Sequence, residues 1–204
     1  MSAAKKEETI LVDFSAGVDP AATDQRILST QGWPGPTLLA LDLGLDCGWC
    51  LVLDGRYKES GVVDLRPTDD QQERYYGPHF VAFEAWLPRL DGKGVTLLVT
   101  EHLQHFPSVR SAQVMLGLLA TVQRRCERDR VAWRGVAPAA LKKWATGRGV
   151  AQKDAMRAAA YQRLHDWGVK RHSRAAPLGD DEADAILLAA YALERLASGD
   201  EWLE

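Results

Sequence analysis

The pattern of hydrophobic and polar positions predicts a β-sheet flanked by helices. Continuous apolar runs, typical of buried strands, alternate with longer segments whose apolar residues recur at helical spacing. Strands are predicted over residues 37–43, 49–53, 59–65, 95–100 and 131–136. Helices are predicted over residues 71–90, with an interruption near Gly77 and Pro78, and over 109–128, 139–144, 153–167 and 181–197. Three hairpin-type strands followed by alternating helices and strands indicate a mixed α/β sheet.

The first 36 residues differ from the rest in being polar and rich in glycine and proline. Only residues 10–14, ILVDF, offer a candidate strand there. We therefore expect an N-terminal extension over residues 1–36 and a single domain over residues 37–204, a length that one hydrophobic core can serve.

Cys47 and Cys50 enclose Gly48 and Trp49 in a pattern found in thiol–disulfide oxidoreductases. Such enzymes place the first cysteine at a helix N-terminus, whereas the apolar residues after Cys50 predict a strand. In a strand the two side chains point to opposite faces, roughly 10 Å apart, and a disulfide needs Cα atoms within about 7 Å. Zinc needs about four ligands, and Cys126 is the only other cysteine. We predict two buried, unreactive thiols.

Cysteine usage and hydropathy also bear on location. An odd number of cysteines, three, argues against a disulfide framework and favours a reducing compartment. The first 14 residues do not resemble a signal peptide, and no apolar run approaches the ~20 residues of a membrane span. We expect a cytoplasmic protein, of a bacterium or a phage-infected cell, that does not bind membranes.

The net charge of −3 conceals a strong segregation of charge. Residues 121–175 hold fourteen basic and four acidic side chains, a net charge of +10, so the rest of the chain carries −13. This asymmetry suggests a face that binds a polyanion, with ordinary solvated helix faces as the alternative.

Acidic residues stand at the ends of two apolar runs and at the start of the last predicted helix. Asp42 follows one run and Glu101 another, while Asp181 and Asp184 share a helix face because they are three residues apart. Turn formation and the helix dipole explain each acid separately, but Asp184 lies where the helix becomes apolar. Four acids at one sheet edge would repel each other without cations, and carboxylates are the ligands of Mg²⁺ and Mn²⁺. Two such ions can promote phosphodiester hydrolysis.

The sequence resembles the RuvC-type Holliday junction resolvases, in particular their phage-type branch, within the ribonuclease H-like superfamily. The similarity is carried by LLALDLGLDCGW (38–49), LLVTEHLQHF (97–106), GVAPAALKKWATGRGVAQKDAM (135–156) and DDEADAILLAAYAL (180–193). It covers about residues 37–197, with three acidic motifs and one basic motif in the family order.

The resemblance implies a ribonuclease H-like mixed five-stranded sheet, its first three strands antiparallel, with flanking helices. It also implies a Mg²⁺-dependent endonuclease with two ions, for which Mn²⁺ can substitute, acting as a homodimer on branched DNA such as a four-way junction. The implied catalytic residues and metal ligands are Asp42, Glu101, Asp181 and Asp184, with Asp180 as an alternative to Asp181. Lys153 matches a family lysine that approaches the scissile region.

Part of the DNA-binding surface is expected around Gly147 and Gly149, which let the backbone approach a phosphate. Lys142, Lys143 and Arg148 would neutralise phosphates; a helix–loop–helix with surface charge is the alternative. Family resolvases often place a base-stacking aromatic shortly after the Glu101 position. Phe106 is the nearest candidate here, two residues late, which leaves the choice among junctions, forks and flaps open.

Two other classes of protein share features with this sequence. Actin-like ATPases and sugar kinases open on a similar Asp-x-Gly strand but need two related domains, for which this chain is too short. A catalytically idle DNA-binding module of the same fold would have no reason to keep four acids. The helix over 109–128, with Val114, Leu118 and Leu119, is a candidate dimer interface unless its apolar stripe only covers the sheet.

Overall fold

A five-stranded mixed sheet forms the centre of the computed structural model, which describes residues 35–66, 76–87, 94–104, 106, 108–170 and 177–199. The strands are β1 (Leu38–Asp42), β2 (Asp46–Leu53), β3 (Arg56–Asp64), β4 (Leu97–Glu101) and β5 (Ala132–Val136). Their order is β3-β2-β1-β4-β5. β1, β2 and β3 are antiparallel neighbours, and β4 runs parallel to both β1 and β5. The predicted fold class is confirmed.

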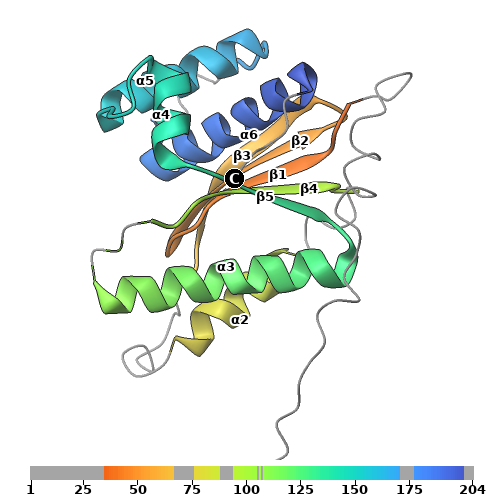
Figure 1. Cartoon of the computed structure of the whole chain (residues 1–204), viewed down its shortest axis with the longest axis vertical. Helices are drawn as coiled ribbons and strands as arrows, with labels where there is room; N and C mark the ends of the chain where they lie inside the picture. Colours follow the sequence, from red (N-terminus) through yellow and green to blue (C-terminus); the bar gives the residue numbers. More distant parts are fainter. Residues whose placement is uncertain are drawn as a thin grey trace, which may run out of the picture.

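Helices cover both faces of the sheet (Figure 1). On one face lie α2 (Gly77–Trp86) and α3 (Val109–Asp129), and on the other lie α4 (Pro138–Thr146), α5 (Lys153–Asp166) and α6 (Asp180–Ser198). Successive β1 residues enter different cores: Leu38 and Ala40 pack with α6, and Leu39 and Leu41 pack with α2 and α3. This two-sided burial explains why β1 is a continuous apolar run.

α3 is an amphipathic helix with defined ends. Ser108 caps it by accepting a hydrogen bond from the Ser111 N–H at 3.1 Å, and Arg130 ends it in a left-handed conformation. Val114 and Leu118 are buried in the core beneath the helix. Val114 and Leu118 therefore cover the sheet instead of forming a dimer interface. Any interface on α3 must use the outer face of the helix.

Most predicted elements are present, and two differ in an instructive way. β2 begins at Asp46, three residues before the predicted start, because a glycine that looks like a turn residue is part of the strand. α2 begins at Gly77 with Pro78 in its first turn, where proline is tolerated, so the predicted interruption is a helix start. Residues 1–34, including the candidate strand 10–14, and residues 71–75 and 88–90 lie outside the described residues.

Cys47 and Cys50 both lie on β2 as buried free thiols. Cys47 belongs to the core under α2 and α3, and Cys50 to the core under α6. The prediction that their side chains point to opposite faces is confirmed. Burial raises the pKa of both thiols well above the usual range, which makes them unreactive.

In its described part, residues 121–170, the basic segment does not form one face, contrary to the simplest interpretation of its charge. Its first part belongs to α3, where Arg124 pairs with Glu84, and both Arg125 and Arg128 pair with Asp129. Its later part belongs to α4 and α5 on the opposite side of the sheet (Figure 1). Only the second group lies on the side of α6.

Among the described residues, no helix is long and apolar enough to cross a membrane.

Candidate active site

Two neighbouring strand ends and one helix start bring acidic side chains together. β1 ends at Asp42 and β4 ends at Glu101. The strands are parallel, and Leu41 is paired with Thr100, so the next residue of each strand lies at the same edge of the sheet. α6 begins at Asp180 and packs against β1, β2 and β4, which carries Asp181 and Asp184 toward that edge.

Gly48 explains how closely α6 approaches the sheet. It is paired with Asp42 across the β1–β2 ladder. A Cβ atom at Gly48 would lie 1.9 Å from the backbone carbonyl oxygen of Asp181, so no other residue fits without moving α6. In the sequence this glycine stands out only as part of the cysteine motif. Its role depends on a contact with a residue 133 positions later in the chain, for which the sequence carries no local signal.

The four carboxylates interact electrostatically. Burial raises the pKa of Asp42 well above its ordinary value, and the charges of Asp184, Glu101 and Asp181 raise it further. Burial, followed by Asp184, raises the pKa of Glu101 to about 7. Burial, with Asp180 and Asp181 adding to it, raises the pKa of Asp184 to about 6. Desolvation and like charge therefore act in the same direction on Asp42, Glu101 and Asp184, and the charge of Asp181 adds to the pKa shifts of Asp42 and Asp184.

Lys142 supplies positive charge to this cluster. Its ammonium group lowers the pKa values of Asp42, Glu101 and Asp184, opposing the larger effect of burial on each. The sequence suggested that Lys142 and Lys143 act alike on the DNA backbone. The structure separates them, because Lys142 on α4 is half-buried near the acids whereas Lys143 is exposed.

Asp180 and Asp181 have different surroundings despite being adjacent. Asp180 accepts hydrogen bonds from Lys153 Nζ at 2.7 Å and from Arg157 Nη1 at 2.6 Å. Lys153 is the main cause that lowers the pKa of Asp180. Burial, together with the charge of Asp46, instead raises the pKa of Asp181. Because Asp180 already has two cationic partners, Asp181 is the better candidate metal ligand. Lys153 contacts Asp180 and not Asp181 in the described hydrogen bonds.

The remaining candidate DNA-binding residues, Arg148 and Phe106, lie in connections between elements. Arg148 is exposed in the loop after α4, which ends at Gly147 in a left-handed conformation with a φ of 77°. Phe106 is half-buried between β4 and α3.

The chemistry of the donor set fits divalent cations. Asp184 Oδ1 is buried and has no hydrogen-bond partner among the described residues, which is unfavourable for a carboxylate unless a ligand satisfies it. The surrounding donors are carboxylate oxygens, which suit Mg²⁺ or Mn²⁺. Within the described ranges, however, no three His, Cys, Asp or Glu side chains converge tightly enough to hold a metal ion.

Comparison with known proteins gives matches in structure only. No protein-family model matches the sequence, and no curated protein matches it either. Among solved structures, Thermus thermophilus RuvC matches with a TM-score of 0.61 and 18% identity over 80% of this chain and 96% of its own. The same protein in complex with a Holliday junction substrate gives a TM-score of 0.62 at 18% identity over the same shares.

One eukaryotic and one viral resolvase match in structure as well. The yeast mitochondrial Holliday junction resolvase Ydc2 matches with a TM-score of 0.57 and 14% identity over 85% of this chain and 84% of its own. Fowlpox virus resolvase, in complex with Holliday junction DNA, matches with a TM-score of 0.54 and 12% identity over 78% and 98%. The chain has the ribonuclease H-like fold of RuvC-type resolvases. At these identities the similarity establishes the fold alone.

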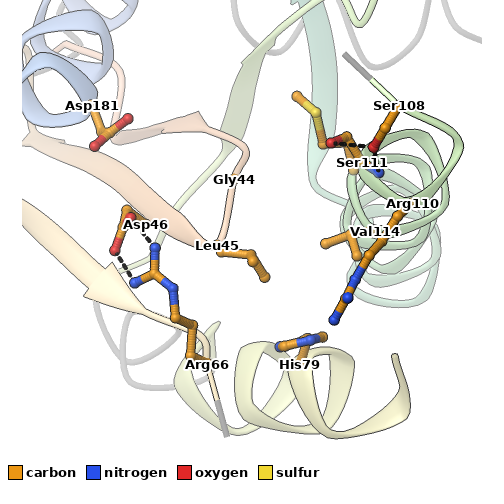
Figure 2. A pocket seen from close by; sticks show the side chains of 11 residues that line it. Gly44, Leu45, Asp46, Arg66, His79, Ser108, Arg110, Ser111, Val114 and Asp181 are labelled. Carbon is orange, nitrogen blue, oxygen red and sulfur yellow. Dashed lines mark hydrogen bonds and ion pairs between the residues drawn. The ribbon is translucent and has the colours of Figure 1, made fainter. Parts of the chain in front are cut away.

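In this RuvC-type fold a pocket of about 450 Å³ has Asp181 in its wall (Figure 2). It is lined by the β1–β2 connection, the end of β3, α2, the start of α3 and Asp181. Arg66 lies at its margin, where its Nη1 donates to Asp46 Oδ1 at 2.6 Å and to Asp64 Oδ1 at 3.1 Å. After burial, the carboxylate of Asp46 is the next cause that raises the pKa of Asp181.

Proposed function

We propose that this protein is a metal-dependent, structure-selective endonuclease that resolves four-way DNA junctions. One observation carries the proposal: Asp42, Glu101 and Asp184, from three distant segments, lie near one sheet edge, where burial and neighbouring acidic charge raise their pKa values. A folded protein keeps such a cluster at the expense of stability, and the arrangement is typical of functional sites. The matched resolvase structures support the substrate class, because RuvC and the fowlpox resolvase were solved in complex with Holliday junctions.

Asp42, Glu101 and Asp184, joined by Asp181, would hold Mg²⁺ ions at this edge. When bound, such ions lower the pKa of a water molecule and neutralise charge on the phosphate. The fold positions these side chains. Asp42 and Glu101 lie at the ends of strands β1 and β4, and Asp184 lies on helix α6. Lys142 adds one positive charge beside three of the acids, which favours the approach of a phosphodiester to an otherwise negative site.

The exposed cations of the α4–α5 side would hold the DNA backbone. Lys143 on α4 and Arg148 in the next loop are both exposed on the side of the sheet where α6 lies. Phosphate contacts of this kind position the duplex and carry little sequence information. Phe106 remains the candidate for stacking on a base near the crossover.

A symmetric homodimer completes the proposal, because paired incision of a junction needs two active sites on opposed strands. The outer face of α3 offers apolar side chains for the contact: Val109 and Leu116 are seven residues apart, on one helix face, and are 77% and 49% exposed. Val81 on the neighbouring helix α2 is 64% exposed. A contiguous patch of exposed apolar side chains is typical of protein interfaces.

Cleavage of synthetic DNA tests the function directly. Four-way, three-way, flap and linear substrates are incubated with Mg²⁺, with Mn²⁺ or with a chelator, and the cut positions are mapped. We expect paired symmetric cuts in the four-way junction that depend on the metal. Equal cleavage of flaps and three-way junctions would instead indicate a broader branched-DNA nuclease.

Variants of the acids distinguish a nuclease from an idle DNA-binding module. Asp42→Asn, Glu101→Gln and Asp184→Asn each remove a charge and keep the shape, so cleavage should fall by about a hundredfold or more while junction binding is kept. Asp166→Asn, on the exposed end of α5, is the matched control and should cut normally. Tight junction binding by the wild type without cleavage in any metal would establish the idle module.

A further inference from the structure

Asp180, the first residue of α6, joins this helix to α5. Its Oδ2 accepts a hydrogen bond from Lys153 Nζ at 2.7 Å, and its Oδ1 accepts one from Arg157 Nη1 at 2.6 Å. Both cations reach one carboxylate because residues four apart lie on the same face of a helix. The two helices also pack through an apolar core that includes Met156 and Ala160. The ion pairs are therefore added to a helix contact that already has buried apolar residues.

Lys153 depends on Asp180 for a fixed position. The Lys153 side chain is 79% exposed, and a lysine has a long, flexible stem. Arg157 has a second partner, Asp154, on its own helix. Among the described residues, Asp180 is the one carboxylate that forms an ion pair with Lys153. Without Asp180 the ammonium group of Lys153 would have no partner to hold it at the start of α6.

The ammonium group of Lys153 is held close to two of the candidate metal ligands. Burial raises the pKa values of Asp181 and Asp184, and the charge of Lys153 is among the causes that oppose this rise. An ammonium group has three N–H donors, and Asp180 accepts one of them. The remaining donors can bind a phosphate oxygen next to these acids.

We propose that Asp180 is a positioning residue, which holds the Lys153 ammonium group where it can contact the phosphodiester that is cut. The inference rests on the proposed function and gives Asp180 a role other than metal binding. Lys153 would stabilise the negative charge that develops on the phosphate during cleavage. Arg157 binds the other carboxylate oxygen and so fixes the orientation of Asp180.

The first experiment compares two carboxylates that both bind Arg157. Asp180→Asn removes the link between the helices, whereas Asp154→Asn removes the same charge within α5 alone. Single-turnover cleavage of a four-way junction is measured with Mg²⁺, and junction affinity with Ca²⁺. Asp180→Asn should lower the cleavage rate about tenfold and change the affinity by less than about threefold, because the contact it supports acts in the transition state. Asp154→Asn should change the rate by less than about twofold.

A double-mutant cycle with Lys153→Ala separates positioning from a structural role. Lys153→Ala should lower the rate at least as much as Asp180→Asn does. The double variant should cut at the rate of Lys153→Ala, because Asp180 acts through Lys153. A structural role would persist without Lys153, since Arg157 still links Asp180 to α5. Losses that multiply in the double variant would therefore overturn the inference.

The Mg²⁺ dependence of the rate separates positioning from metal binding. The half-saturating Mg²⁺ concentration should rise by less than about threefold in Asp180→Asn and by about tenfold or more in Asp181→Asn, because only the second variant loses a ligand. Equal shifts in the two variants would make Asp180 a metal ligand and overturn the inference.

These outcomes also separate the role of Asp180 from the proposed function. A wild type that neither binds nor cuts branched DNA overturns both together. A wild type that cuts, with Asp180→Asn indistinguishable from Asp154→Asn, overturns the positioning role alone. Circular dichroism of Asp180→Asn should show a folded protein, because the buried contacts between α5 and α6 are kept.

Discussion

Asp42 is the most constrained of the acidic residues. It lies at the end of a buried strand, three other carboxylates raise its pKa, and Lys142 opposes them only in part. Removing a carboxylate from water and placing it beside like charges both disfavour the charged form. At neutral pH the metal-free protein must therefore either bind a proton at one of these carboxylates or lose stability through repulsion between their negative charges.

Asp42→Asn should consequently stabilise the metal-free protein while destroying its activity. Thermal unfolding in a chelator near pH 8 should show a higher Tm for Asp42→Asn, by about 2–4 °C for each kcal/mol of repulsion removed. Adding Mg²⁺ should raise the Tm of the wild type more than that of the variant, because a ligand that binds the native state stabilises it. Asp166→Asn serves as the control. A lower Tm for Asp42→Asn in chelator would mean that the charge is already compensated.

Lys142 and Lys143 provide a second test at the scale of single residues. They are adjacent in sequence, but only Lys142 lowers the pKa values of the buried acids. Lys142→Ala should lower the single-turnover cleavage rate about tenfold or more, with a smaller effect on binding, because it removes charge next to the reacting phosphate. Lys143→Ala should weaken binding to every DNA by a similar factor and leave the rate at saturation unchanged. Equal effects of the two variants on both quantities would contradict these assignments.

At the scale of elements, the contact between α6 and β2 decides where the helix-borne acids lie. Gly48 lies under the first turn of α6, and the apolar residues Ala183, Ala185 and Ile186 are fully buried in the sheet-facing side of the helix. The side chain of Glu182 accepts a hydrogen bond from Ser60 Oγ on β3 at 2.7 Å, which fixes the same turn from the other side. Asp181 and Asp184 are thus placed by close packing of one helical turn rather than by a flexible loop.

Gly48→Ala should displace the start of α6 and separate the acids. The added Cβ meets backbone at 1.9 Å, so α6 must move, at a cost of about 1–3 kcal/mol in unfolding free energy. Cleavage should fall by at least tenfold, and the rise of Tm with Mg²⁺ should shrink, while junction binding through α4 and α5 persists. Gly179→Ser is the matched control, because the space around Gly179 is open and serine suits the start of a helix. Wild-type Mg²⁺ response in a folded Gly48→Ala protein would show that α6 is positioned by other contacts.

At the scale of the whole molecule, the two sides of the sheet have separate tasks in the proposed enzyme. The α4–α5–α6 side carries the acids and the exposed cations, whereas the α2–α3 side packs its own core and leaves apolar residues outside. α2 and α3 are pressed closely together: a Cβ at Gly117 would lie 2.2 Å from the Phe80 ring. This pair forms a rigid surface on which a second copy could dock.

Leu116→Glu should therefore convert the proposed dimer to a monomer. Light scattering at micromolar concentration should give twice the monomer mass for the wild type and the monomer mass for the variant, because a buried interface tolerates an unpaired charge poorly. The variant should nick one strand of a junction rather than making paired cuts. Val62→Glu, which places the same charge on a 45% exposed position of β3, should remain dimeric. A wild-type monomer that still makes paired cuts would exclude this use of α3.

The sequence by itself determined the local features of this protein. Strands β1 and β4 were predicted because burial on both faces demands unbroken apolar runs, and their polar ends marked Asp42 and Glu101 as neighbours at a sheet edge. The opposite directions of Cys47 and Cys50 followed from the two-residue period of a strand. The antiparallel start of the sheet followed from the hairpin-type spacing and from the family resemblance.

Only the tertiary structure decided which distant groups touch. It pairs Asp180 with Lys153 and Arg157, lets Lys142 rather than Lys143 act on the acids, and gives Gly48 its role beneath Asp181. It also divides the basic segment between two faces of the sheet, although its charges are continuous in sequence. The physical reason is the same in each case: hydropathy patterns report the period and burial of one element, whereas ion pairs and close backbone contacts depend on how separate elements pack.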